Sequence, residues 1–456
     1  MSNSTVRKQI DDYINEHIDD FIQDLSRLCA QPSISATGEG IDQCAYLVCE
    51  MLNEYGYESE ILSTAGNPLV FAQASGINDK TLLFYLHYDV QPPEPFEAWE
   101  SPPFELTRRG DKFYARGSAD DKGHIIARLA GLAAVQYALG GLPCHVKFMV
   151  EGEEELGSPS MTDFINQNAG KLSADGCVWE FGGVNHDNVP TLALGMRGIC
   201  YVELFVKTAE IDAHSGLGGS IFPNAAWQLV WALQSLKSKD EHILIPSFYD
   251  NTIPPTAQDL DLLSKLPDDA EKIRTMYGLK HFLGGLTGGL DFQSAAVFEP
   301  TCTICGLSSG YQGRGSKTVL PAEARAKIDF RLVPNQTPEE ILQKLRQHLD
   351  TLGFDDVEIQ YNGGTRPART DPDHPFVKLT SETALAVYGK EPLISPMIGG
   401  SGPNYPFIHT LNLPVVSSGI GYPGANAHAP NEHIRLDDFI QGIRHTAYIV
   451  EAFASR

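Results

Sequence analysis

Histidine and carboxylate side chains recur directly after short apolar runs of this 456-residue sequence. His87 and Asp89 follow one such run, and Glu154 and Glu155 follow another. Imidazole and carboxylate groups without cysteine suit zinc, manganese or cobalt. These residue types therefore indicate metal binding as the candidate chemistry.

Each of these motifs also has an ordinary structural explanation. His87 can be a simple strand-end histidine, with Asp89 two residues further on and on the same side of the strand. Asp120 and Asp121 precede a predicted helix, where aspartates cap free backbone donors and meet the helix dipole favourably. The acidic run 151–155 can be a solvated loop, although such close like charges repel unless water or metal neutralises them. No single motif decides between the two explanations.

The elements that must position these residues favour one common site. The predicted buried strands are residues 81–86, 145–150, 176–179 and 414–418, and the predicted helices between and after them include residues 125–139 and 436–453. This order predicts an α/β domain with a parallel sheet covered by helices on both faces. Glu180 and His428 follow the last two strands. Since such sheets bind ligands beyond the carboxyl ends of their strands, the candidates are expected to converge, with Asp120 bridging two cations.

The middle of the chain shows a different pattern. Residues 200–207 and 324–332 alternate apolar with polar side chains, which predicts strands with one wetter face. Thr337 and Pro338 open a capped helix, and residues 357–361 predict a further strand. This order predicts a ferredoxin-like α+β domain, residues 197–364, inserted into a catalytic domain formed by residues 1–196 and 365–456. Residues 237–289 are predicted to be irregular.

Composition limits the classes of function. The length predicts two domains, and the formal net charge of -24 argues against a nucleic-acid partner, because phosphate binding needs a basic face. No apolar run approaches the length of a bilayer span, and the charged start differs from a signal peptide, so we expect a cytoplasmic protein that does not bind membranes. The eight scattered cysteines predict no disulfide framework, and the single pair Cys302 and Cys305 is predicted to pack structurally.

The ordered motifs resemble the metallopeptidase family of glutamate carboxypeptidase, acetylornithine deacetylase and carnosine dipeptidase, and are most similar to its cytosolic dipeptidase branch. The resemblance spans essentially the whole chain. It rests on His87-Tyr88-Asp89-Val90-Gln91-Pro92, Arg116-Gly117-Ser118-Ala119-Asp120-Asp121-Lys122-Gly123, Glu154-Glu155, Asp212-Ala213-His214-Ser215-Gly216, Lys317-Thr318-Val319 and Arg331-Leu332-Val333-Pro334-Asn335. One departure is that the dipeptidase branch usually has aspartate at the position of Glu180, where other branches have glutamate.

The resemblance implies a dinuclear metal site. One divalent ion would be held by His87, Asp120 and Glu180, and the other by Asp120, Glu155 and His428. Zinc is the preferred ion, with manganese or cobalt as alternatives that this ligand set also suits.

Two carboxylates are expected to assist the metals. By resemblance Glu154 is the general base, which accepts a proton from the attacking water and delivers it to the leaving amine. Asp89 is placed by its spacing to accept the second ring N–H of His87 and so orient that ligand.

The resemblance also implies substrate contacts. His214 would reach the active site of a partner subunit and stabilise the oxyanion, in a dimer formed by the inserted domain. Arg331 would bind the terminal carboxylate of the substrate, because its planar guanidinium matches a carboxylate bidentately. Ser401 and His374 resemble substrate contacts more faintly, and helix capping explains both as well. A surface role is the alternative for His214 and Arg331.

The leading hypothesis is therefore a homodimeric metal-dependent dipeptidase or related exopeptidase. A rival enzyme is an amidohydrolase that removes an acyl group from an amino acid with the same metals and base. A rival from another class is a non-catalytic member that keeps the fold as a binding protein. The intact Glu154 beside Asp120 and Glu155 speaks against that last alternative.

Overall fold

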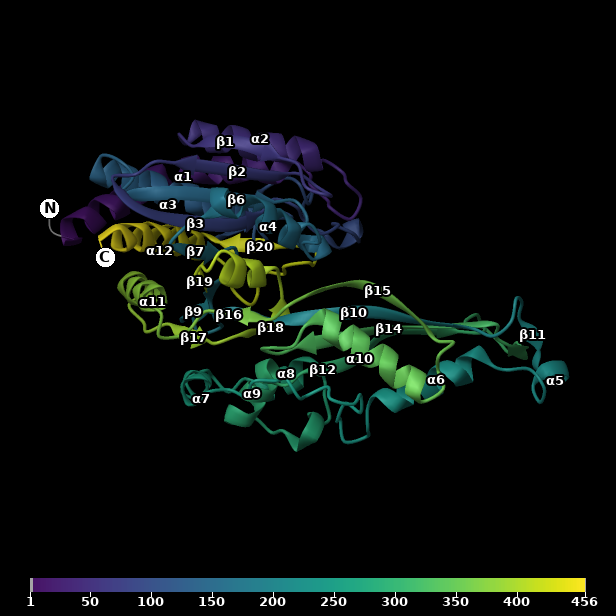
Figure 1. Ribbon diagram of the computed structural model, residues 1–456. Coiled ribbons are helices and arrows are strands. Elements are labelled where there is room, and N and C mark those ends of the chain that lie inside the picture. Colours follow the sequence, from purple (N-terminus) through teal and green to yellow (C-terminus); the bar gives the residue numbers. More distant parts are fainter. Residues whose placement is uncertain (1–2, 456) are drawn as a thin grey trace. The chain divides into compact units, whose positions relative to one another are not determined.

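The computed structural model describes residues 3–455, which divide into two compact units (Figure 1). Within the described residues, the first unit comprises residues 3–195, 369–397 and 403–455, and the second comprises Met196–Ala368 and Ile398–Gly402. The predicted insertion, residues 197–364, lies within the second unit, and its role in dimerisation stays a prediction. The short return of the chain at Ile398–Gly402 was not predicted from the sequence.

A six-stranded mixed sheet forms the centre of the first unit. Its strands in spatial order are β1 (Glu58–Leu62), β2 (Leu69–Ala74), β6 (Cys144–Glu151), β3 (Asn78–His87), β7 (Gly176–Trp179) and β19 (Val415–Ser417). The strands from β6 to β19 run parallel, whereas β1 and β2 pair antiparallel at one edge. The predicted mainly parallel sheet is therefore confirmed.

Both faces of the parallel strands are buried. The helices of one layer are α1 (Asn3–Ala30), α3 (Lys122–Leu139) and α12 (Leu436–Ser455), which pack together, and α3 and α12 contact β3. Phe84 and Leu86 of β3 belong to the core that these helices cover. Tyr85 points to the opposite face, where its ring stacks on that of Trp179. Burial on both faces explains why these strands are continuous apolar runs in the sequence.

The register of the parallel strands brings their carboxyl ends to within about two residues of one another. His87 at the end of β3 pairs with Glu151 at the end of β6, and Trp179 at the end of β7 pairs with Ser417 at the end of β19. Residues that follow these strands therefore emerge at the same edge of the sheet.

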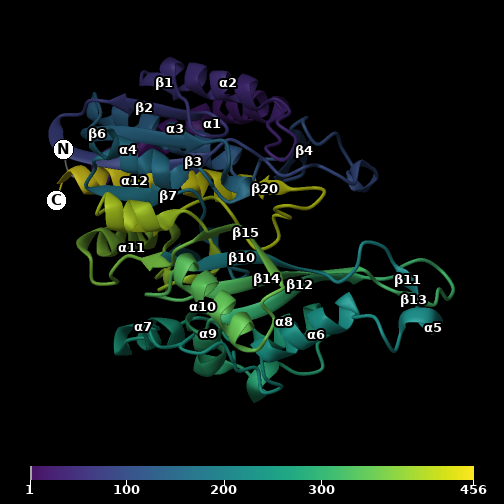
Figure 2. The same ribbon diagram turned by 45° about the vertical axis from the view of Figure 1, so that its right-hand side comes forward.

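Four antiparallel strands form the centre of the second unit, and the short strand β18 (Ile398–Ser401) pairs parallel with β10 beside them. The four strands in spatial order are β12 (Thr301–Ser309), β14 (Glu323–Leu332), β10 (Gly195–Lys207) and β15 (Glu358–Thr365), with helices α6 (Ala225–Leu236) and α10 (Pro338–Thr351). Figure 2 shows both helices on the same side of β10 and β14. The chain order β10, α6, β12, β14, α10, β15 is the predicted ferredoxin-like arrangement.

Side chains of this second sheet alternate between a buried and a wetter face, as the sequence predicted. Val202 and Leu204 of β10 and Ile328 of β14 are fully buried against α6 and α10. The predicted cap of α10 is also present, because Thr337 Oγ1 accepts a hydrogen bond from the backbone N–H of Glu340 at 3.2 Å. Local pattern and local capping chemistry therefore specified these elements.

The stretch 237–289 is not wholly irregular, and that prediction was wrong in part. It contains two short helices, α7 (Ala257–Ser264) and α8 (Ala270–Met276). Thr256 and Asp259 form a reciprocal capping box at the start of α7, which stabilises a helix that the proline-rich and acidic composition concealed.

Two expectations from the composition concerned disulfide bonds and membrane-spanning helices. All eight cysteines are free, with Cys302 buried and Cys305 exposed on β12. Within residues 3–455, no helix combines the length and the apolar character that crossing a membrane requires.

Candidate metal centre

The Asp120 carboxylate lies between two histidines. Its Oδ1 is 3.0 Å from His87 Nε2, and its Oδ2 is 2.9 Å from His428 Nε2. Glu155 Oε2 lies 3.1 Å from the same nitrogen of His428. Ligand atoms of Asp120, Glu155 and His428 all lie within 4.8 Å of one another, as the donors of one metal ion would. A carboxylate with one oxygen facing each histidine is suited to bridge two cations.

The local backbone explains how distant residues reach this place. His87 is the last residue of β3, Glu155 lies in the short 3₁₀ turn Glu154–Leu156 after β6, and Asp120 lies in the loop before α3. His428 adopts a left-handed backbone conformation with φ of 62°. A residue with a Cβ rarely adopts such a conformation unless its surroundings hold it there, as they often do at functional sites.

Glu180 supplies an independent test of whether a cation fits. This residue follows β7, is 5% exposed, and its Oε2 is buried without a hydrogen-bond partner among the described residues. Burial raises the pKa of Glu180 well above its ordinary value, and the charge of Glu154 raises it further. A buried carboxylate without a partner is costly, and a divalent cation would provide the missing charge. The donor set therefore fits a metal centre.

The protein on its own already places positive charge on both sides of Asp120. Contacts with Asp120 and Glu155 raise the pKa of His428 to about 10. Burial lowers the pKa of His87, but contacts with Asp120 and Asp89 outweigh it and hold the pKa well above the ordinary value. Burial also raises the pKa of Asp120, yet the two histidines hold it well below the usual range. The electrostatics thus favour an ionised Asp120 facing two positive centres.

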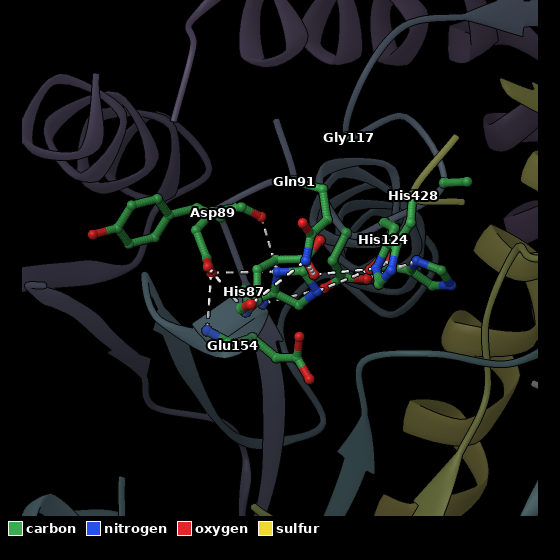
Figure 3. A network of polar contacts seen from close by, with 12 residues as sticks. His87, Asp89, Gln91, Gly117, His124, Glu154 and His428 are labelled. Carbon is green, nitrogen blue, oxygen red and sulfur yellow. Dashed lines mark hydrogen bonds and ion pairs between the residues drawn. The ribbon is translucent and has the colours of Figure 1, made fainter. Parts of the chain in front are cut away.

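The carboxylate of Glu154 lies beside this network (Figure 3), and within the described residues only the backbone of Glu154 is hydrogen-bonded to it. Figure 3 shows its carboxylate near His87, and no dashed contact reaches that carboxylate among the residues drawn. Burial raises the pKa of Glu154 to about 7; His87 opposes this shift, and Asp120 and Glu155 add to it. A carboxyl group that gains and loses a proton near neutral pH is suited to acid–base catalysis.

Asp89 contacts His87 with both its main chain and its side chain, and it makes further contacts that were not predicted. His87 Nδ1 lies 3.0 Å from the backbone carbonyl oxygen of Asp89, and 3.5 Å from its carboxylate. The Asp89 carboxylate also accepts hydrogen bonds from the backbone N–H groups of Glu154 at 3.2 Å and Glu155 at 3.1 Å. Asp89 therefore contacts the His87 ring with its carbonyl oxygen and its carboxylate, and the same carboxylate holds the glutamate turn (Figure 3). The pairing of β3 with β6 brings these groups together.

Two further residues support the ligands and were missed as site residues. Gln91 Nε2 donates to Glu155 Oε2 at 2.8 Å, which orients that carboxylate. Asp121 accepts a hydrogen bond from the backbone N–H of His87 at 3.2 Å and forms an ion pair with His124 at 2.7 Å. Both lie inside the motifs quoted from the sequence, so their position in those motifs was the available signal.

Comparison with known proteins decides the family. Residues 83–452 match the family described as Peptidase family M20/M25/M40. The chain belongs to this peptidase family. It is 26% identical to the Beta-Ala-His dipeptidase of Mus musculus over 94% of this chain and 92% of that protein, and 26% identical to the Cys-Gly metallodipeptidase of Schizosaccharomyces pombe over 97% of each. These matches confirm the resemblance that the motifs predicted.

Solved structures agree with this assignment. The M20 family metallo-carboxypeptidase Sso-CP2 from Sulfolobus solfataricus is 36% identical, with a TM-score of 0.92 over 96% of this chain and 99% of that one. Human carnosine dipeptidase 1, at 24% identity and a TM-score of 0.79, shares the fold. This M20 chain is therefore a peptidase with the α/β architecture of its family.

Two of the predicted substrate contacts of this M20 peptidase cap helices. His374 Nδ1 accepts a hydrogen bond from the backbone N–H of Phe376 at 3.1 Å, at the start of α11 (Pro375–Tyr388) in the first unit. His214, in the second unit, accepts from the backbone N–H of Gly216 at 3.0 Å, and its side chain is exposed. Capping therefore accounts for one ring nitrogen of each histidine and leaves the other ring nitrogen to be explained.

The remaining two predicted contacts lie together in the second unit. Arg331 Nη1 donates to Ser401 Oγ at 2.8 Å, and its Nε donates to Asp329 Oδ2 at 3.1 Å. Ser401 ends strand β18 (Ile398–Ser401) and donates to the carbonyl of Gly198 at 3.1 Å, so the helix-capping explanation of Ser401 was wrong. Sequence distance concealed this pair, because β18 returns to β10 from far along the chain.

Proposed function

We propose that this M20 peptidase hydrolyses the amide bond of dipeptides and other short peptides with a free terminal carboxylate. The observation that carries the proposal is the Asp120 carboxylate held between His87 and His428 with Glu154 alongside. The relatives support the substrate class, because their names describe dipeptidases and a carboxypeptidase.

The proposed cofactors are two divalent metal ions, with zinc preferred and manganese or cobalt as alternatives. One would be held by His87, Asp120 and Glu180, and the other by Asp120, Glu155 and His428. When bound, the two ions would make a shared water more acidic and would polarise the carbonyl of the scissile amide.

Glu154 carries the proton in this proposal. Its carboxylate accepts a proton from the attacking water and then delivers it to the nitrogen of the leaving amine. The Asp89 carboxylate holds the backbone N–H groups of Glu154 and Glu155 and keeps this turn in place. Proton transfer needs the acceptor within hydrogen-bond reach of the water, which a fixed turn favours.

Arg331 is the proposed binding group for the terminal carboxylate of the substrate. Ser401 and Asp329 contact two different nitrogens of its guanidinium. These contacts fix the orientation of the guanidinium plane, and a carboxylate binds bidentately in that plane. His374 is retained as a weaker candidate contact, through the ring nitrogen that does not cap α11.

The sheet register supports the proposal that His214 serves a second copy of the chain. Arg331 pairs with Ile199 at one end of the ladder of β10 and β14, whereas Lys207 pairs with Glu323 at the other end, just before the pairing of His214 with Val319. The eight residue-to-residue steps from Ile199 to Lys207 span about 27 Å, at roughly 3.4 Å per step. An extended dipeptide spans only about 7 Å. One substrate therefore cannot touch both side chains of the same chain.

An exposed apolar stripe supports the proposed homodimer. Trp227, Val230 and Trp231 of α6 are 57%, 42% and 56% exposed, and the two indole rings stack with centroids 5.8 Å apart. Large aromatic side chains exposed together are typical of surfaces that bind another protein.

We also infer a cytoplasmic location and no nucleic-acid partner. The formal net charge of -24 supports the second part, because an acidic surface repels phosphate groups. Cell fractionation and a binding assay with labelled DNA and RNA test these two points.

An activity panel tests the proposed function. Metal-stripped protein is reloaded with zinc, manganese or cobalt and incubated with unblocked dipeptides, carboxy-amidated dipeptides and N-acyl amino acids. We expect turnover of unblocked dipeptides and much weaker turnover of the amidated ones. Cleavage of N-acyl amino acids alone would establish the deacylase instead. No turnover of any substrate with any of the three metals would establish the non-catalytic alternative.

A further inference from the structure

A buried glutamate outside the ligand set lies against the loop that carries Asp120. Glu432 is fully buried, and each of its two carboxylate oxygens accepts two hydrogen bonds. Oε1 accepts from the backbone N–H groups of Ala119 at 2.8 Å and Asp120 at 3.1 Å. Oε2 accepts from the backbone N–H of Gly117 at 3.1 Å and from Arg116 Nη1 at 2.6 Å.

Strand pairing places Glu432 in this position. Strand β20 (His433–Arg435) begins directly after Glu432 and pairs with β5 (Lys112–Tyr114), so that His433 lies opposite Tyr114. The carbonyl oxygen of Glu432 continues this ladder by accepting the backbone N–H of Ala115 at 3.1 Å. Both the main chain and the side chain of Glu432 are therefore bound to the segment that leads into the Asp120 loop.

Burial of the Glu432 carboxylate requires both the charge of Arg116 and the backbone N–H donors of the loop. A buried carboxylate is strongly unfavourable unless it is paired and hydrogen-bonded. Arg116 is 1% exposed and supplies the opposite charge, while three backbone N–H groups of one loop supply the remaining donors. The loop is thus folded around a carboxylate that is not itself a candidate ligand, because its oxygens are already occupied.

We propose that Glu432, held by Arg116, is a positioning residue that places the bridging carboxylate of Asp120 and thereby sets the affinity of the metal pair. This inference rests on the proposed metal site. The segment from His428 to Glu432 then has two tasks: its first residue is a ligand of one ion, and its last residue fixes the backbone of the ligand shared by both.

Glutamine at this position provides a sharp test. A Glu432→Gln side chain has the same shape but only one acceptor oxygen. In either orientation its NH₂ group must face two N–H donors, either those of Ala119 and Asp120 or those of Gly117 and Arg116. The loop must then shift, and the bridging carboxylate shifts with it. Loss of such supporting contacts typically weakens metal binding by about 10–100-fold.

The experiment measures cobalt binding to metal-stripped protein. Cobalt(II) is titrated into wild-type, Glu432→Gln and Glu451→Gln proteins, and the visible absorption spectrum and the dissociation constant are recorded. Glu451 is the matched control, because it is also a buried glutamate paired with an arginine, Arg7 at 3.1 Å, but it contacts α1 and not the Asp120 loop. We expect binding at least tenfold weaker and an altered cobalt spectrum for Glu432→Gln, and wild-type behaviour for Glu451→Gln.

A second variant guards against loss of folding. Glu432→Asp keeps the charge opposite Arg116 but is one methylene shorter, so it cannot reach both sets of donors. We expect it to melt cooperatively, as followed by circular dichroism, and to bind cobalt more weakly than wild type. Wild-type cobalt affinity and spectrum in a folded Glu432→Gln or Glu432→Asp protein would overturn the inference. Absence of cobalt binding to the wild-type protein would instead overturn the proposed metal site on which the inference rests.

Discussion

The two sheets of the molecule carry their polar side chains in different places. In the six-stranded sheet of the first unit, the strands β3, β6 and β7 are buried along most of their length, and polar residues follow at their carboxyl ends, as Glu154 and Glu180 do. In the antiparallel sheet of the second unit, one face of β14 is exposed or half-buried along its length and carries charged residues such as Arg325 and Arg331.

This difference has a simple physical cause. Parallel strands covered on both faces have room for polar groups only where the strands end, and those ends lie close together, so the groups converge. An antiparallel sheet covered on one face spreads its polar groups over the other. The first unit is therefore suited to build a dense site, and the second is suited to contribute single contacts at separate points, such as His214 and Arg331 at opposite ends of one ladder.

The largest expected effect comes from the convergent site. Glu154→Gln removes the proton carrier and leaves the five candidate ligands, so kcat for a dipeptide should fall by about 10²–10⁴-fold. The metal content, measured by atomic emission, should remain that of the wild-type protein. Near-normal turnover in the fully loaded variant would contradict the role of Glu154.

The next effect concerns metal affinity: His428→Ala should weaken metal binding, and the role of His428 as a ligand should also appear in the pH dependence of metal binding. In the metal-free protein the contacts with Asp120 and Glu155 hold the pKa of His428 at about 10, so at neutral pH the ring carries a proton. A metal ion binds only the neutral ring, and binding must therefore release that proton. The wild-type dissociation constant for cobalt should fall as pH rises from 6 to 8, by up to about tenfold per pH unit for each proton released.

The variant provides the comparison for this pH dependence. His428→Ala should bind cobalt more weakly at every pH, and its affinity should depend less steeply on pH, because one titrating ligand is gone. An affinity of the wild-type protein that does not change with pH, or an unchanged metal-to-protein ratio in His428→Ala, would count against His428 as a ligand.

In the second unit, Arg331 should affect substrate binding and not the metals. Arg331→Lys keeps the charge but loses the planar fork, and a hydrogen bond to a charged group contributes about 1.5–3 kcal/mol, so KM for an unblocked dipeptide should rise by roughly 10–100-fold. Hydrolysis of the carboxy-amidated dipeptide is the control, because it lacks the carboxylate. An equal rise of KM for both substrates would show that Arg331 does not bind the terminal carboxylate.

The smallest signal is a gain of activity from two impaired proteins. Subunits carrying His214→Ala are mixed with subunits carrying Glu154→Gln, and heterodimers are isolated by two affinity tags. If His214 acts across the dimer, one of the two sites regains both residues, since a symmetric dimer exchanges the same element both ways. Isolated heterodimers without any recovered activity would show that each chain uses its own His214.

Much of the fold could be predicted because its signals are local. Continuous apolar runs marked β3, β6 and β7, alternation marked β10 and β14, and a capping sequence marked α10. The candidate ligands could be selected for the same reason, since each stands directly beside such an element. The helix α7 escaped prediction, because its capping box lies in a stretch whose overall composition indicates irregular structure.

The sequence alone therefore determined which residue types stand at the strand ends and which family they resemble. Only the tertiary structure decided which groups support them: the amides held by Asp89, the Gln91 contact to Glu155, and the loop held by Glu432. These contacts join residues from distant parts of the chain. They depend on the registers of β3 with β6 and of β5 with β20, which no local pattern specifies, because a strand's apolar pattern shows which face is buried but not which partner lies beside it.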